Sequence, residues 1–218
     1  MFTATKTIET EIDKSHQPRS LQPSHRITSI DLLRGLVMII MALDHTRDFF
    51  HAQAFTQDPL DLDTTTPVLF FTRWITHFCA PVFVFLAGTS AFLQGLRKSK
   101  KELSVFLIKR GLWLILIELT VINFAFTFDP TFSFFGLQTI WAIGISMVFL
   151  GLAIWLPFAA ILALGLIIVF GHNALDFYER GRAGGFGFLY DLIHRPNFYP
   201  LWGKHNLLIL YPFLPWTG

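Results

Sequence analysis

Four ionisable residues recur on one face of the first apolar segment of the chain: Asp31, Arg34, His45 and Asp48. A helix over 27–50 places them in one stripe, because their spacing follows its 3.6-residue period. The guanidinium of Arg34 suits a phosphate or carboxylate ligand. The imidazole of His45 suits a general base or a nucleophile. The two lie roughly 16 Å apart along the helix axis, so the stripe resembles half of an active site.

Each of these side chains also has a structural interpretation. Arg34 can pair with Asp31 one turn earlier, and in that role Asp31 can also orient Arg34 for a ligand. His45 can be a helix-end histidine in contact with water, or Asp48 at i+3 can orient its ring for catalysis. Charged groups inside a bilayer-crossing helix are costly, which favours a functional reason for the stripe.

Two further polar residues fall inside apolar segments. His77 lies one turn before Pro81, and a proline removes the helical hydrogen bond to the carbonyl four residues earlier. Glu118 lies near the middle of the run 105–126, where a carboxyl group is expected to face the interior of a helix bundle. Both are candidates to complete a catalytic pocket. The structural alternatives are a proline kink and an interhelical hydrogen bond.

The elements that position these residues are predicted to be membrane helices. Hydrophobic residues make up 53% of the chain and charged residues 15%, whereas soluble domains average about a quarter charged. The mean hydropathy is +0.52. We predict an all-α fold, a polytopic transmembrane helix bundle. Its apolar runs are 27–50, 68–96, 105–126, 136–156 and 157–171, with the start of a sixth near 206.

The distribution of charge predicts the orientation. Residues 1–25 are polar and are expected to form a disordered cytoplasmic tail, with 26–218 as one transmembrane domain. Basic residues gather in the segment after the second run: Arg97, Lys98, Lys100 and Lys101. Because Lys and Arg favour the cytoplasmic side, the chain is predicted to be a multi-pass cell-membrane protein with a cytoplasmic N-terminus. The sixth run is too short to cross a bilayer, so we expect a C-terminally truncated fragment.

Other patterns in the sequence concern helix packing, metal binding and nucleic-acid binding. Ala87, Ala91 and Gly95 repeat every four residues, which predicts a close helix contact. No two histidines stand four apart in one helix and no Cys/His quartet occurs, so the spacing predicts no metal site. The net charge of +2 gives no global basic field for nucleic acid.

Several motifs resemble one known family. The run 26–35 (RITSIDLLRG) resembles the opening of the heparan-alpha-glucosaminide N-acetyltransferase-like membrane proteins, in particular their bacterial branch, which is related to the membrane acyltransferases. The patches 81–90 (PVFVFLAGTS), 136–144 (GLQTIWAIG) and 211–216 (YPFLPW) agree with it. The likeness covers about 26–218. The first helix is also similar to that of the wider membrane acyltransferases, which have a basic residue, ten further residues and then a histidine. Arg34 and His45 fit this spacing.

This resemblance implies acyl transfer from cytoplasmic acyl-CoA, with acetyl-CoA expected, to an amino sugar or glycan. Arg34 and Asp31 would bind the co-substrate, while His45, His77 and Glu118 would serve catalysis. The family's histidine just ahead of the second span has no counterpart here, because alignment on Pro81 puts Pro67 or a neighbour there. The expected partners are the lipid bilayer, a small-molecule acyl donor and a sugar acceptor, with a homodimer as an open alternative.

Two other classes of function stay open at the level of sequence. Ionisable residues inside a membrane also mark the paths of transporters and proton-coupled permeases. The same residues could instead hold helices together in a membrane scaffold.

Overall fold

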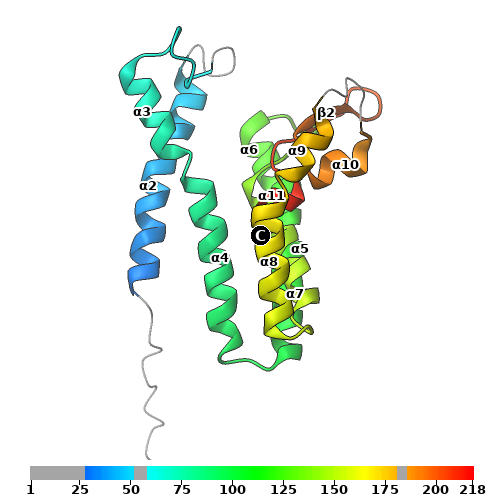
Figure 1. Ribbon diagram of the computed structural model, residues 1–218. Coiled ribbons are helices and arrows are strands. Elements are labelled where there is room, and N and C mark those ends of the chain that lie inside the picture. Colours follow the sequence, from blue (N-terminus) through cyan, green and yellow to red (C-terminus); the bar gives the residue numbers. More distant parts are fainter. Residues whose placement is uncertain (1–27, 52–57, 181–185) are drawn as a thin grey trace, which may run out of the picture. The chain divides into compact units, whose positions relative to one another are not determined.

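The computed structural model describes residues 28–51, 58–180 and 186–218. The predicted tail 1–25 therefore lies outside the described residues. The chain divides into two compact units, Met1–Leu33 and Arg34–Gly218. Of the first, only 28–33 are described, and they open helix α2 (Thr28–Phe50). All the other elements belong to the second unit (Figure 1).

The predicted second span is two helices, α3 (Pro67–Thr76) and α4 (Cys79–Gly95), with a turn at His77 and Phe78. Thr66 caps the start of α3 by accepting the N–H of Leu69. The break lies one turn before Pro81, where the missing N–H of the proline was expected to disturb the helix. Within the described residues, the stretch Pro67–Gly95 is the one that is long and apolar enough to cross a membrane, by length and composition.

The predicted third span begins with a capping box. The Ser99 hydroxyl accepts the N–H of Glu102, and the Glu102 carboxylate accepts the N–H of Ser99. The hydrogen bonds that the Ser99 N–H and hydroxyl donate to the Glu102 carboxylate lower the pKa of Glu102 below its usual range. The helices that follow are α5 (Lys100–Ile117), the π-helix η1 (Glu118–Ile122) and α6 (Asn123–Thr127).

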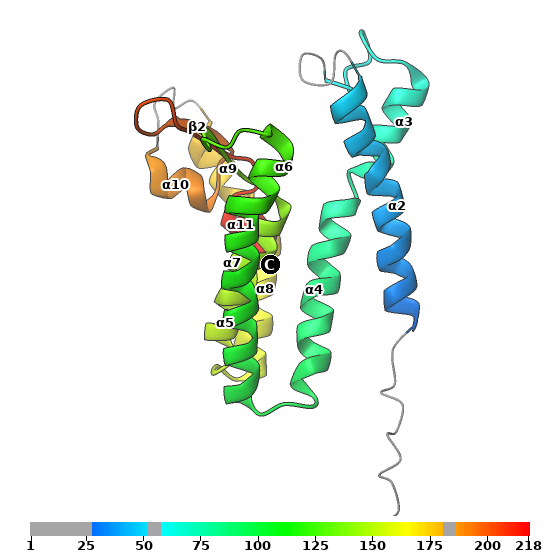
Figure 2. The ribbon, with the colours of Figure 1, turned by 180° about the vertical axis from the view of Figure 1, so that it is seen from behind.

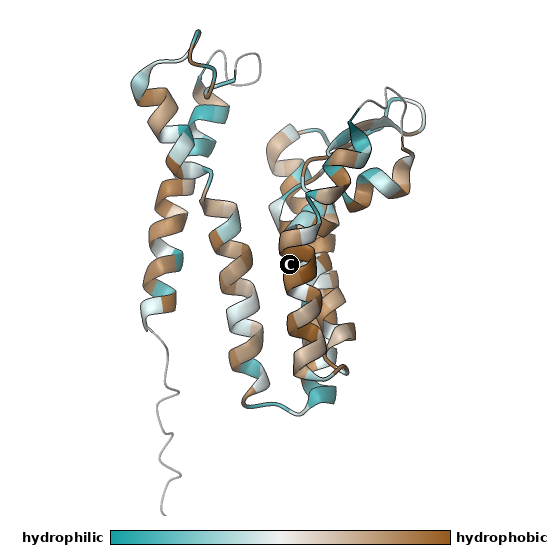
Figure 3. Cartoon of the chain, in the orientation of Figure 1, coloured by the Kyte–Doolittle hydropathy of each residue, from teal (hydrophilic) through white to brown (hydrophobic). Residues whose placement is uncertain are grey.

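Helices α7 (Thr139–Ala153) and α8 (Phe158–Gly171) correspond to the fourth and fifth predicted runs. In both ribbon views α5 and α7 lie side by side (Figure 2). Their backbones approach at Gly111 and Gly144, where a Cβ on Gly111 would lie 2.4 Å from the Gly144 carbonyl oxygen. Hydrophobic residues run along α7 and α8 (Figure 3).

Helix α4 joins this pair through a buried core of Ala91, Leu103, Leu107 and Met147. The small-residue repeat on α4 therefore makes the close contact that was predicted for it. At Gly95, an added Cβ would lie 3.1 Å from the Leu103 side chain.

The all-α prediction is right for most of the described residues and wrong in one region. The strands β1 (Phe134–Leu137), β2 (Asn197–Pro200) and β3 (Asn206–Ile209) form a sheet of order β1-β3-β2. Strand β3 pairs parallel with β1 and antiparallel with β2. The predicted start of a sixth membrane helix is therefore β3 followed by the short helix α11 (Phe213–Thr217).

The residues of β3 explain this difference. Leu207 and Ile209 are buried while their neighbours are half-buried, which is the two-residue period of a strand. With Leu137 of β1 they form a small core. Pro212 and Pro215 then limit helix formation, and α11 has only 5 residues. Between α8 and β2 lie two short helices, α9 (Ala174–Glu179) and α10 (Phe188–Ile193).

Candidate functional site

A network of charged side chains surrounds the C-terminal end of α2. Arg73 from α3 donates a hydrogen bond of 2.5 Å to the Oδ2 atom of Asp44. Arg47 donates to the Oδ1 atom of Asp48 at 2.6 Å, and its Nη1 atom lies 3.1 Å from Oδ1 of Asp44. These four side chains are partly buried, so water screens their charges only in part.

His45 lies at the edge of this network. Its Nδ1 atom is 3.9 Å from the Oδ2 atom of Asp48, the neighbour predicted from the i+3 spacing. On another side its ring meets the ring of Phe126 edge-on, with centroids 5.8 Å apart. The His45 side chain is 43% exposed. At 3.9 Å the two atoms are too far apart for a hydrogen bond, and Nδ1 of His45 has no hydrogen-bond partner within the described part of the chain.

Sequence reasoning missed part of this network. Asp44 lies off the stripe of ionisable residues that the spacing predicted, yet it pairs with both Arg47 and Arg73. The spacing of Asp44 and Arg47 at i+3 is a signal that the sequence contains. The contribution of Arg73 depends on the packing of α3 against α2, which the spacing in the sequence does not reveal.

Arg34 lies near the other end of α2. Its Nη2 atom donates a hydrogen bond to the Ser90 hydroxyl of α4 and lies 3.4 Å from the Leu86 carbonyl oxygen. Ser90 in turn donates to the same carbonyl at 2.7 Å. Arg34 therefore links α2 to α4 in the second unit. Because Asp31 lies in the first unit, its pairing with Arg34 stays a prediction.

His77 occupies the turn between α3 and α4 and is exposed. In the described part of the chain, its side chain makes no hydrogen bond, ion pair or ring contact with His45, Arg34 or Glu118. The break one turn before Pro81 therefore leaves an exposed imidazole at the junction of α3 and α4. A catalytic role for His77 stays a prediction.

Glu118 is buried, with 1% of its surface exposed, at the start of the π-helix η1. Its Oε1 atom accepts the backbone N–H of Gln138, and its Oε2 atom accepts that of Trp141, both at 3.3 Å. These N–H groups open α7, where the helix dipole favours a negative charge. The contacts of Glu118 are those of a capping residue, which supports its structural interpretation. Its catalytic role stays a prediction.

Asn123 completes this junction. Its amide nitrogen donates to the Glu118 carbonyl at 2.8 Å, and its Oδ1 atom accepts the N–H of Gly136 at 2.6 Å. The side chain thereby ties η1 to β1. π-Helical turns occur frequently at functional sites, but here the polar groups inside the turn bind neighbouring elements of the chain.

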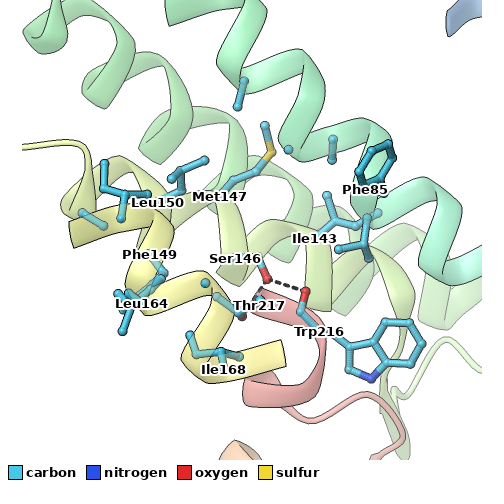
Figure 4. Close-up of a pocket in the computed structure, with 18 of the residues that line it drawn as sticks. Phe85, Ile143, Ser146, Met147, Phe149, Leu150, Leu164, Ile168, Trp216 and Thr217 are labelled. Carbon is cyan, nitrogen blue, oxygen red and sulfur yellow. Dashed lines mark hydrogen bonds between the residues drawn. The ribbon is translucent and has the colours of Figure 1, made fainter. Parts of the chain in front are cut away.

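A separate cavity of about 320 Å³ lies among α4, α7, α8 and α11 (Figure 4). Its walls are mostly apolar, and its polar groups include Ser146 and Thr217, whose hydroxyl oxygens are 2.9 Å apart. None of the predicted site residues lines this cavity. It is therefore distinct from the site predicted on α2.

Outside these sites, another cluster brings a histidine close to two carboxylates. One side-chain atom each from Asp176, Glu179 and His194 lies within 4.8 Å of the others. The spacing in the sequence predicted no metal site, because no two histidines stand four apart in one helix and no Cys/His quartet occurs. His194 reaches Glu179 through the fold, from the end of another helix.

Comparison with known proteins places the chain in a family. The family described as heparan-alpha-glucosaminide N-acetyltransferase, catalytic, matches residues 26–218. The chain belongs to this family. The family is one of membrane acetyltransferases that use acetyl-CoA as the donor. No curated protein and no solved structure matches the chain.

Proposed function

We propose that this member of the family is a multi-pass membrane acyltransferase. It would move an acyl group, expected to be acetyl, from cytoplasmic acyl-CoA to an amino sugar or glycan. The family match over 26–218 carries the proposal. Support comes from α2, which holds a carboxylate-paired imidazole near one end and a guanidinium near the other.

His45 would act as the general base. As the acceptor amine attacks the thioester carbonyl, its proton passes to the imidazole and a C–N bond forms. Collapse of the tetrahedral intermediate breaks the C–S bond, and the coenzyme A thiolate leaves and takes the proton back from His45. Asp48 would stabilise the imidazolium between the two transfers, since its carboxylate lies 3.9 Å from Nδ1.

Arg34 would bind the anionic end of the acyl donor, steadied by Asp31. The guanidinium fork matches phosphate oxygens geometrically. Its distance from His45 along α2, roughly 16 Å, is comparable to an extended pantetheine arm. Ser90 holds the Arg34 side chain against α4 and limits the conformations that it can adopt.

His77 and Glu118 would support the reaction in different ways. His77 is a second candidate base, because it is exposed at the break between α3 and α4. Glu118 would position α7 by capping it and would act on the reaction only through that helix.

The proposal is tested by acyl transfer in the full-length protein. Purified protein in detergent would be assayed with radiolabelled acetyl-CoA and glucosamine as acceptor. His45→Ala is expected to lower kcat by about 10²–10⁴-fold, as for loss of a general base. Arg34→Ala is expected to raise KM for the donor. Arg97→Ala, at an exposed position after α4, is the matched arginine control. Wild-type rates in both His45→Ala and Arg34→Ala would sink the proposal.

A transporter is the second candidate. The partly buried network of Asp44, Arg47, Asp48 and Arg73 favours it, because such networks also line substrate and proton paths in membranes. Reconstitution in proteoliposomes separates the two candidates. Sugar uptake that needs no acyl-CoA would decide for transport.

A further inference from the structure

Helix α9 and the residue after α10 bring together side chains that the acyl-transfer proposal does not use. His194 is buried, with 4% of its side chain exposed, while the Asp176 side chain is 52% exposed. The Nδ1 atom of His194 lies 2.8 Å from Oε1 of Glu179. Its Nε2 atom lies 3.1 Å from the His172 carbonyl oxygen and 3.8 Å from Oδ1 of Asp176.

Both ring nitrogens of His194 therefore face oxygen acceptors. The contact with Glu179 is satisfied when Nδ1 carries a proton. In the neutral ring Nε2 then has a lone pair, and that lone pair points at two oxygen atoms. Something positive must lie between Nε2 and these oxygens, either a second proton or a metal ion.

The two distances from Nε2 of His194 to its neighbouring oxygens fit a metal ion. Tetrahedral zinc with bonds of about 2.0–2.1 Å places its ligands roughly 3.3 Å apart. The distances from Nε2 to the two oxygens, 3.1 and 3.8 Å, bracket that value. A histidine that binds metal through one nitrogen and donates from the other to a carboxylate is a common second-shell arrangement. Glu179 supplies that carboxylate.

Glu179 is itself held in place by its neighbours. Its Oε1 atom accepts the hydroxyl of Tyr190 at 3.0 Å, and its Oε2 atom lies 3.5 Å from Nε of Arg195. Burial, and then the hydrogen bond to Glu179, raise the pKa of Tyr190 above its usual range, so the phenol stays a donor. The charge of Arg195 opposes a cation here, while the two carboxylates favour one.

We propose that His194, Asp176 and the His172 carbonyl bind one divalent transition-metal ion. Nε2 of His194, the Asp176 carboxylate and the carbonyl oxygen are the ligands, and water completes the coordination. Glu179 orients His194, and the exposed Asp176 marks the route by which the ion enters. The ion ties the end of α8 and α9 to the end of α10. This inference does not rest on the proposed acyl transfer.

Zinc binding to the full chain tests the proposal. Protein in detergent is stripped with a chelator and titrated with zinc by calorimetry. One zinc ion per chain and a raised thermal midpoint are expected. Asp176→Asn is expected to weaken binding by at least tenfold, and Glu179→Gln by about 10–100-fold. Arg195→Gln should tighten binding, because it removes the opposing charge. His51→Ala, at an exposed histidine outside the cluster, is the matched control and should bind as the wild type does.

The outcomes separate a metal site from a simple ion pair. No zinc bound at one equivalent means that His194 carries the second proton, and the proposal fails. Equal loss in Asp176→Asn and His51→Ala, or magnesium binding as tight as zinc, also overturns it. Asp176→Asn changes a half-exposed side chain and should leave the fold intact. Zinc binding can therefore be measured in this variant even where the buried His194→Ala does not fold.

Discussion

At the scale of the residue, the partners of a buried carboxylate decide what it can do. Glu118 accepts two backbone N–H groups at the start of α7, so its carboxyl oxygens cap the helix. His45, by contrast, is partly exposed and has a carboxylate beside it. The sequence around Glu118 is apolar, whereas His45 lies among Asp44, Arg47 and Asp48, and the contacts of the two side chains differ accordingly.

The capping role of Glu118 predicts a change in stability. Glu118→Ala leaves two buried N–H groups without their acceptor, which costs about 1–3 kcal/mol in the free energy of unfolding. Glu118→Gln keeps one carbonyl acceptor and should lose less. Denaturant or thermal unfolding of the purified protein in detergent measures both. Thr120→Ala, at an exposed position two residues further along η1, is the control. Full stability together with lost acyl transfer would instead make Glu118 a catalytic residue.

At the scale of the element, α5 and α7 pack closely because Gly111 and Gly144 have no side chains where the two backbones approach. An added Cβ on Gly144 would lie 2.9 Å from the Gly111 carbonyl oxygen and 3.2 Å from the backbone nitrogen of Ile115. Backbone atoms cannot move aside as the end of a flexible side chain can. Ser104 strengthens the same interface by donating to the Gly151 carbonyl at 2.6 Å.

This packing predicts opposite effects for two glycines in similar helices. Gly144→Ala should destabilise the protein by about 1–3 kcal/mol, the usual cost of overpacking. Gly165→Ala in α8 meets no atom within 4 Å, and alanine favours a helix by up to about 1 kcal/mol, so it should be neutral or stabilising. Thermal unfolding of both variants in one detergent checks the pair. Equal midpoints would show that the α5–α7 interface can relax.

The sequence was informative about helices and much less so about the sheet. The apolar runs located α2, α4, α5, α7 and α8, since each run is long and continuous. Strands of 4 residues leave little periodic signal. The pairing of Phe134 with Asn206 is also a contact between segments far apart in the chain. The same distinction holds in the site: Asp48 was predicted from its spacing to His45, whereas the reach of Arg73 to Asp44 depends on tertiary packing.

At the scale of the whole molecule, the proposed reaction requires a donor on one side of the membrane and an acceptor on the other. Helix α4 has 17 residues, about 26 Å of helix at 1.5 Å per residue, which is slightly less than a bilayer core of about 30 Å. The full stretch Pro67–Gly95 has 29 residues and is long enough. A crossing at this point therefore needs part of α3 as well as α4, despite the break at His77.

Cysteine labelling tests that crossing and its direction. Cys79 is the one cysteine in the sequence and is buried, so Cys79→Ala gives a silent background. On it, Asp63→Cys and Lys101→Cys place exposed thiols on either side of the stretch. A membrane-impermeant maleimide on intact cells should label position 63, and position 101 only after permeabilisation, because the basic segment is expected to stay in the cytoplasm. Labelling of both in intact cells would mean that Pro67–Gly95 does not cross. Labelling of position 101 alone would reverse the orientation and place Arg34 on the wrong side for a cytoplasmic donor.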